Sequence, residues 1–176
     1  MTRLSIVVCI SLVMLGLIYS HVGIAEQVCK PTNAGNIARQ FDTTREGVVI
    51  DKQGLMWMRC ALGQQWATGR CVRSHESYTF REAQDYINEY NSRGGAFGFA
   101  DWRLPTLAEL LSIVEPACHA PAANRNVFPE APVTAFWTST LDPAYAQGVM
   151  LVHFVNGRVY MGNRSVAWSV RLVRER

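Results

Sequence analysis

The sequence contains no internal repeat, no low-complexity tract and no Cys-x-x-Cys pair. The cysteines after residue 25 are separated by 31, 11 and 47 residues, and these spacings match no zinc-binding pattern. No glycine-rich loop leads from a strand into a helix in the order that phosphate binding requires. We therefore expect neither a structural zinc site nor a nucleotide-binding site.

Residues that would indicate an active site are scarce. The histidines after residue 25 are His75, His119 and His153. No two of them have the spacing of metal ligands. Ser165 and Ser169 have no accompanying His and Asp arrangement that would indicate a nucleophile. We expect no catalytic residue, no bound metal and no cofactor, so the sequence predicts a protein that is not an enzyme.

Charge is also low, because 18% of the residues are charged and the formal net charge is +3. A balance this mild does not predict a nucleic-acid partner. From Pro143 onward, however, five arginines accompany a single glutamate, so this stretch carries +4 while residues 26–142 carry about −2. A basic C-terminal face would suit an acidic partner, and the alternative is a solvated surface that binds nothing.

The first 25 residues have the order of a secretory signal peptide. Arg3 precedes an uncharged run from Leu4 to Ile18, and Gly23 and Ala25 supply the small residues that a signal peptidase requires. We therefore expect cleavage before Glu26 and export to the periplasm or the exterior of a bacterial cell. The apolar run also approaches the roughly 20 residues of a membrane-spanning helix, so an uncleaved anchor is the alternative.

The cysteines predict two disulfides. Cys9 lies inside the apolar run, without the small residues that precede a lipoprotein cleavage site, and would leave with the signal peptide. An even number of cysteines then remains in an exported chain, and three pairings are possible. Because Cys60 and Cys71 flank a short loop that contains glycine, we expect them to pair with each other. Cys29 would then tie the mature N-terminus to Cys118.

Length and composition predict one domain. About 150 mature residues and 49% apolar composition are enough for a single hydrophobic core. Residues 26–46 are rich in Asn, Thr and Gly and are expected to form an extended lead-in, with the domain over residues 47–176. Val48–Ile50 and Leu55–Met58 are short apolar runs around a Gly-containing turn, which predicts a hairpin.

Two helices are predicted by a Thr followed three residues later by a Glu, the pattern of a capping box. Thr79 with Glu82 begins the first helix, which ends before Gly94, and Thr106 with Glu109 begins the second, which ends at Pro116. Both glutamates are therefore interpreted as caps. The apolar stripes are expected at Phe80, Ala83, Ile87 and Tyr90 and at Leu107, Leu110, Leu111 and Val114.

The second half of the chain predicts an antiparallel sheet. The expected strands lie at 136–139, 149–155, 158–161 and 168–173. Asn156–Gly157 predicts a two-residue hairpin with a type I′ turn. With the helices between two sets of strands, the fold class is α+β, and the first hairpin is expected to pair with the last strand and bring the termini together.

Four motifs in this order resemble one family. They are Gly54-Leu-Met-Trp-Met-Arg-Cys60, Asp101-Trp-Arg-Leu-Pro-Thr106 with Glu109-Leu110, Phe136-Trp-Thr-Ser139, and Val170-Arg-Leu-Val-Arg174. Over residues 47–174 the chain resembles the Lcl C-terminal domain family, long described as a domain of unknown function. The resemblance implies a C-type lectin-like fold in an exported bacterial protein, and the domain of the founding adhesin binds sulfated glycosaminoglycans at a basic surface.

The chemistry of these motifs is mainly structural. Trp102 and Leu104 are expected to enter the core, while Pro105 and Thr106 shape the entry to the second helix. Asp101 and Arg103 are expected to brace the loop, and Arg171 to reach a carboxylate on the opposite strand.

Two activities known in related families are not expected in this chain. Calcium-dependent lectins of this fold use a Trp-Asn-Asp triplet, whereas Thr138 and Ser139 follow Trp137 here and neither is a strong calcium ligand. Formylglycine-generating and related oxidising enzymes need a free thiol, and two disulfides would leave none in the mature chain.

We therefore interpret the chain as a binding module for an anionic glycan or for a protein of the cell envelope or surface. The expected ligand-binding residues are Arg158, Tyr160, Arg164 and Trp168. Arginine can bind sulfate or carboxylate with two parallel hydrogen bonds, and aromatic rings can stack on sugar rings. The alternative is a structural or accessory subunit of an envelope assembly that uses the same surface as an interface. The sequence does not predict the oligomeric state, and a membrane contact is expected only through an uncleaved signal segment.

Overall fold

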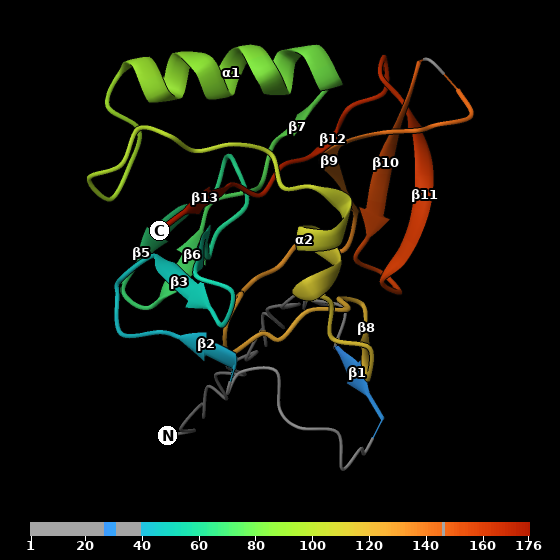
Figure 1. Cartoon of the computed structure of the whole chain (residues 1–176). Helices are drawn as coiled ribbons and strands as arrows, with labels where there is room; N and C mark the ends of the chain where they lie inside the picture. Colours follow the sequence, from blue (N-terminus) through green and yellow to red (C-terminus); the bar gives the residue numbers. More distant parts are fainter. Residues whose placement is uncertain (1–26, 31–39, 146) are drawn as a thin grey trace, which may run out of the picture.

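A computed structural model of the chain describes residues 27–30, 40–145 and 147–176. The predicted signal peptide and its anchor alternative lie outside these residues. Two helices and four sheets, mostly antiparallel, make up the described part, which confirms the α+β class (Figure 1). The C-type lectin-like fold remains a prediction from the resemblance.

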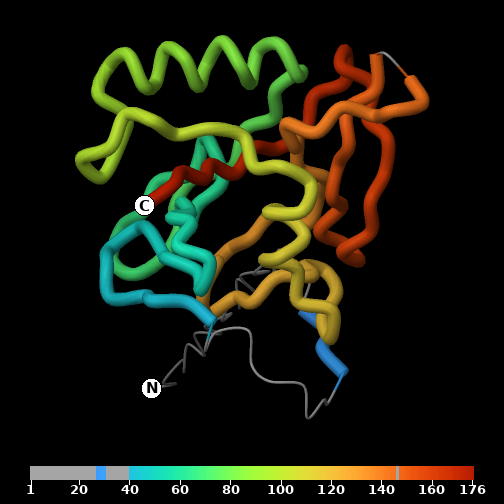
Figure 2. Tube along the Cα trace, in the orientation of Figure 1, coloured from blue at the N-terminus to red at the C-terminus, as the bar shows by residue number. Residues whose placement is uncertain are grey.

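The early hairpin pairs with the end of the chain. Strands β3 (Val48–Asp51) and β4 (Leu55–Met58) form the predicted hairpin, and β4 pairs antiparallel with β13 (Val173–Glu175). A short strand β2 (Phe41–Asp42) completes this sheet in the order β13-β4-β3-β2. Figure 2 shows the red C-terminal segment beside the blue-green hairpin, so the predicted pairing of the first hairpin with the last strand is confirmed.

The larger sheet has five strands in the order β11-β10-β9-β12-β7. Their bounds are β7 Ser77–Tyr78, β9 Ala135–Leu141, β10 Gly148–His153, β11 Arg158–Asn163 and β12 Trp168–Ser169. The β12 and β9 strands are parallel, which differs from the expected antiparallel sheet. After β11 the chain crosses to the other side of β9, and this crossover sets the direction of β12.

The turn between β10 and β11 differs from the predicted type I′ turn. His153 pairs with Arg158, so four residues connect the strands, and among them only Gly157 has a positive φ, at 72°. Phe154, the first of the four, is 1% exposed and packs against Phe136 with ring centroids 5.1 Å apart. Phe154 is in the same core cluster as Val152, and its backbone N–H donates to the Thr134 carbonyl oxygen at 2.8 Å. It therefore continues beside β9, while the loop to β11 is two residues longer than predicted.

Both capping boxes are present. Helix α1 (Phe80–Ser92) has Thr79 as its N-cap, and α2 (Leu107–Ser112) has Thr106. The second helix is shorter than predicted and has a different stripe, because Leu111 is 37% exposed while Leu110 and Ile113 are completely buried. In the described part of the chain, no helix is long and apolar enough to cross a membrane.

Two disulfides with the predicted pairing hold the peripheral segments. Cys29–Cys118 joins β1 (Val28–Cys29) to β8 (Cys118–His119), across a sequence separation of 89 residues. Cys60–Cys71 closes the segment that carries the β5 (Gln65–Ala67) and β6 (Arg70–Val72) hairpin.

The core forms two clusters because strands β4 and β9 are buried on both faces. Met56 and Trp137 belong to the cluster beneath α1, which also contains Trp102. Their neighbours in sequence, Trp57 and Phe136, belong to a second cluster. Successive side chains of a strand point to opposite faces, so each of these strands contributes to both clusters.

Candidate functional site

Arg158 and Tyr160 lie together on the outermost strand of the five-stranded sheet. They are two residues apart on β11, so both side chains project from the same face. Tyr160 is 44% exposed, and its ring packs edge-on against His153 at 5.9 Å. Asn156 in the turn donates a hydrogen bond to the Tyr160 hydroxyl, at 3.4 Å. We call Arg158, Tyr160, His153 and Asn156 the β11 surface.

Arg164 and Trp168 lie at a different place. The Arg164 guanidinium is 5.5 Å from the centre of the Phe80 ring at the start of α1, and Trp168 pairs with Tyr78 in the sheet. Arg164 follows Arg158 by six residues of extended chain, which span about 20 Å. The structure therefore brings the four predicted ligand-binding residues together as two pairs and not as one patch.

Polar atoms of the second pair are buried without a partner. The Arg164 Nε and Trp168 Nε1 atoms are both inaccessible and have no hydrogen-bond acceptor among the described residues. Both side chains are half-buried. The Nε–H of Arg164 and the indole N–H of Trp168 are therefore not open to a ligand in solution.

The C-terminal arginines do not form one basic face. Arg171 is 1% exposed, and its Nη1 donates to the carbonyl oxygens of Met58, at 2.9 Å, and Arg59, at 2.5 Å. The prediction that Arg171 would reach a carboxylate was wrong, because carbonyl groups at the end of β4 and the ring of Phe128, 4.6 Å away, surround the guanidinium. Burial lowers the pKa of Arg171 from its usual value.

Arg174 is also occupied by an internal contact. Its guanidinium makes two hydrogen bonds with the Asp101 carboxylate, at 2.6 and 3.0 Å, and lies 4.0 Å from the centre of the Phe99 ring. These hydrogen bonds lower the pKa of Asp101. Of the five arginines that produced the +4 count, Arg158 and Arg176 are the ones classed as exposed.

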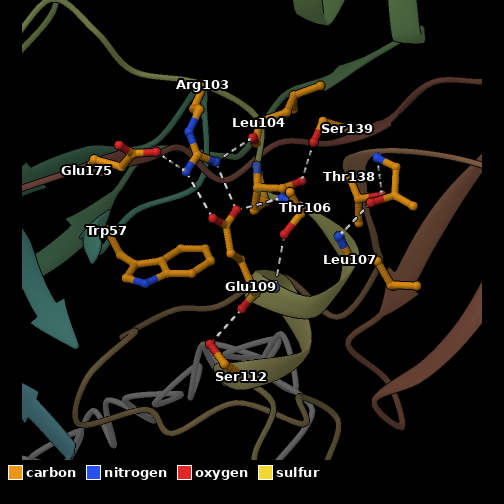
Figure 3. Close-up of polar contacts among 12 residues, drawn as sticks. Trp57, Arg103, Leu104, Thr106, Leu107, Glu109, Ser112, Thr138, Ser139 and Glu175 are labelled. Carbon is orange, nitrogen blue, oxygen red and sulfur yellow. Dashed lines mark hydrogen bonds and ion pairs between the residues drawn. The ribbon is translucent and has the colours of Figure 1, made fainter. Parts of the chain in front are cut away.

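The Arg-Leu-Pro-Thr motif centres on an ion pair, shown in Figure 3. Arg103 donates two hydrogen bonds to Glu109, at 2.8 and 2.9 Å, and its Nη2 lies 3.6 Å from Glu175 on β13. Glu109 also accepts the backbone N–H of Thr106, at 2.7 Å, in the capping box. The hydrogen bonds from Arg103 lower the pKa of Glu109, although partial burial opposes them.

The model of the Lcl C-terminal domain family matches residues 47–174. This chain belongs to the Lcl C-terminal domain family. No curated protein matches the chain. Family membership and the two disulfides together indicate an exported module that folds in an oxidising compartment.

In this Lcl C-terminal domain the Phe-Trp-Thr-Ser motif lies within β9 and contacts the segment that leads into α2. Thr138 is completely buried, and its hydroxyl donates to the Met150 carbonyl oxygen, at 2.7 Å. Ser139 donates its backbone N–H to the Pro105 carbonyl oxygen, at 2.8 Å, and Thr140 accepts the N–H of Leu107, at 2.9 Å (Figure 3). These contacts are all internal, which agrees with a structural role for the motif.

The remaining candidates lie apart from one another. His75 and His119 are exposed and lie in separate segments of the Lcl C-terminal domain. Within the residues that the structure describes, no group of three or more His, Cys, Asp or Glu side chains is placed to hold a metal ion. Sequence analysis missed His153 as a neighbour of Tyr160. The predicted hairpin was the available signal, because a two-residue turn at Asn156–Gly157 places His153 opposite Tyr160, whereas the four-residue loop pairs it with Arg158.

Proposed function

We propose that this Lcl C-terminal domain is an exported, non-catalytic binding module that recognises an anionic partner through the β11 surface. The partner is an anionic glycan or a protein of the cell envelope or surface. Two observations support a non-catalytic role. Glu82 and Glu109, which were candidate catalytic acids, cap helices. The described cysteines are paired in disulfides and offer no free thiol.

The exposed edge of the sheet is the observation that carries this proposal. β11 is the last strand in its sheet, and its first four residues, Arg158 to Met161, are all exposed. Val159 is 37% and Met161 51% exposed on the face opposite to Tyr160. An edge strand with free backbone groups and exposed apolar side chains is a template for contact with another molecule.

The residues of this edge favour a protein over an anionic glycan as the partner. Sulfated glycans are bound by several cations together, whereas the structure separates the C-terminal arginines. One exposed guanidinium beside Val159, Tyr160 and Met161 suits a protein surface that offers a carboxylate and apolar groups. The same edge would serve a structural or accessory subunit, in which the contact is permanent.

A matched pair of arginine variants tests the proposal. Arg158→Ala removes the cation of the β11 surface, while Arg81→Ala removes an arginine on α1 whose side chain is 90% exposed. We expect Arg158→Ala, but not Arg81→Ala, to reduce photo-crosslinking of envelope proteins from position 161 in intact cells and retention on a heparin column. Binding should weaken with salt and should not respond to calcium chelation.

Three results separate the outcomes. Equal crosslinking and retention in the two arginine variants would contradict the proposal. Loss of binding with chelator would point to a metal-dependent site instead. Precipitation of the chain when its crosslinked partner is deleted would favour the accessory subunit over a reversible binding module.

A further inference from the structure

A cleft of about 650 Å³ lies between the β5–β6 hairpin, α1 and the loop at residues 94–99. Ligand sites commonly have volumes of roughly 300–1,000 Å³. The hairpin and β11 are on opposite sides of the molecule in Figure 1, so this cleft is separate from the β11 surface. The aromatic residues in its wall are Trp66, Tyr86, Tyr90 and Phe97.

Trp66 is held by contacts around its indole. It pairs with Cys71 in the hairpin, which the Cys60–Cys71 disulfide closes. The indole N–H donates to the Glu46 carboxylate, and the Arg59 guanidinium lies 4.3 Å from the ring centre. The orientation of the ring is therefore set before any ligand arrives, which reduces the entropy lost on binding.

Phe97 is exposed in spite of a costly backbone conformation. Its φ is +56° and it is 44% exposed, although bulky side chains rarely adopt positive φ. Gly47 makes room for the ring, because a Cβ there would lie 2.3 Å from Phe97 Cε1. The loop is anchored by Trp102, whose Nε1 donates to the carbonyl oxygens of Ala96 and Phe99, at 3.2 and 3.0 Å. Such an outlier, held by a rigid anchor, is characteristic of binding sites.

The polar residues of the wall carry balanced charge. Gln65, Arg73 and Glu76 are exposed and line the cleft together with the tyrosines. Tyr86 and Tyr90 are stacked with ring centroids 5.9 Å apart, and burial raises the pKa of Tyr90, so its hydroxyl stays protonated at neutral pH. One cation and one anion among neutral donors and acceptors favour a ligand without net charge.

We infer that this cleft binds a neutral hexopyranose unit of a glycan. The apolar C–H face of the sugar stacks on the ring of Trp66 or Phe97, and its hydroxyls exchange hydrogen bonds with Gln65, Arg73 and Glu76. Hydroxyls both donate and accept, so they match an amide, a guanidinium and a carboxylate at once. A proline-rich peptide offers mainly carbonyl acceptors, whereas Glu76, which already accepts a hydrogen bond from the Tyr78 hydroxyl, can accept further hydrogen bonds only from donors.

Calorimetric titration of the mature chain with cellotriose, chitotriose and maltotriose tests the inference. We expect saturable binding of at least one of these neutral trisaccharides, which Trp66→Ala weakens at least about tenfold, a loss of about 1.4 kcal/mol. A proline-rich peptide and a heparin oligosaccharide are titrated in parallel. Binding of either of these without binding of any trisaccharide would overturn the inference.

Phe97→Gly separates binding from folding. It removes the ring and relieves the positive φ, so we expect the melting temperature to stay at or above that of the wild type while sugar affinity falls. Tyr145→Ala is the control, because Tyr145 is 61% exposed outside the cleft, and both properties should remain unchanged. Full sugar affinity in Phe97→Gly and Trp66→Ala would refute the site. Arg158→Ala should leave sugar affinity unchanged, so this result is independent of the proposed function.

Discussion

The substitution Glu109→Gln removes the carboxylate charge that Arg103 contacts while keeping a side chain that can cap α2. Arg103 makes hydrogen bonds of 2.8 and 2.9 Å to this carboxylate, which also accepts the N–H of Thr106. Glutamine serves in capping boxes as glutamate does, so the change acts mainly on the ion pair.

The expected magnitude follows from burial. Hydrogen bonds to charged groups contribute about 1.5–3 kcal/mol each when they are well shielded. The side chain of Glu109 is 19% exposed, but that of Arg103 is 35% exposed, so solvent screens part of the interaction. We expect Glu109→Gln to lower the free energy of unfolding by about 1–2 kcal/mol at pH 7.

The loss should depend on pH in a defined direction. Hydrogen bonds from Arg103 lower the pKa of Glu109 in the folded state, whereas an unfolded glutamate titrates near 4.3. A lowered folded pKa contributes stability that is fully present above the unfolded value and is lost as the pH falls through the folded value. The difference between wild type and Glu109→Gln should therefore shrink between pH 6 and pH 3.

Urea unfolding followed by far-UV circular dichroism at pH 7 and pH 3 measures both effects. Glu82→Gln is the matched control, because Glu82 caps α1 through Thr79 and is exposed. Its effect should be smaller than that of Glu109→Gln. Equal losses in the two variants, or a loss in Glu109→Gln that is the same at both pH values, would refute the stabilising role of the ion pair.

Three further predictions concern the fold. Mass spectrometry of unreduced peptides should recover Cys29–Cys118 in a chain that starts at Glu26, and free thiols at these positions would contradict the pairing. Replacing both cysteines by serine should lower the free energy of unfolding in urea by on the order of 4 kcal/mol. Trp102→Ala and Leu110→Ala should each lower the free energy of unfolding by about 2–5 kcal/mol. A wild-type melting temperature in either variant would show that the substituted residue does not support the core. Gly162→Ala should cost about 1–3 kcal/mol in thermal unfolding, because its Cβ would lie 2.6 Å from a buried leucine methyl group, and an unchanged melting temperature would contradict this crowding.

Local sequence signals predicted much of the fold. Both capping boxes depend on residues three apart in the chain, and both are present in the structure. The disulfides followed from cysteine number and loop length, and the first hairpin from two apolar runs around a turn. The capping boxes, the hairpin and Cys60–Cys71 are decided by residues close in sequence, so a single sequence is enough to predict them. Cys29–Cys118 spans 89 residues and followed only because these two cysteines remained.

The candidate site was less predictable. Counting charges after Pro143 treated Arg158 and Arg171 as equivalent, but one projects from an edge strand while the other lies inside the core. The aromatic cleft has no sequence signature, because Trp66, Tyr90 and Phe97 come from a hairpin, a helix and a loop.

The sequence by itself determined where both helices begin, the first hairpin and the local Cys60–Cys71 disulfide. Only the tertiary structure decided which side chains remain exposed to solvent and how the strands are paired. The loop before β11 is an example. Asn156–Gly157 predicts a two-residue turn, yet His153 pairs with Arg158 across a four-residue loop, and Phe154 in that loop continues beside β9 through its hydrogen bond to Thr134. The register of β10 and β11 is set by how the faces of these strands pack, so two turn residues alone do not decide it. Exposure depends on what packs from distant parts of the chain, and no local pattern contains that information.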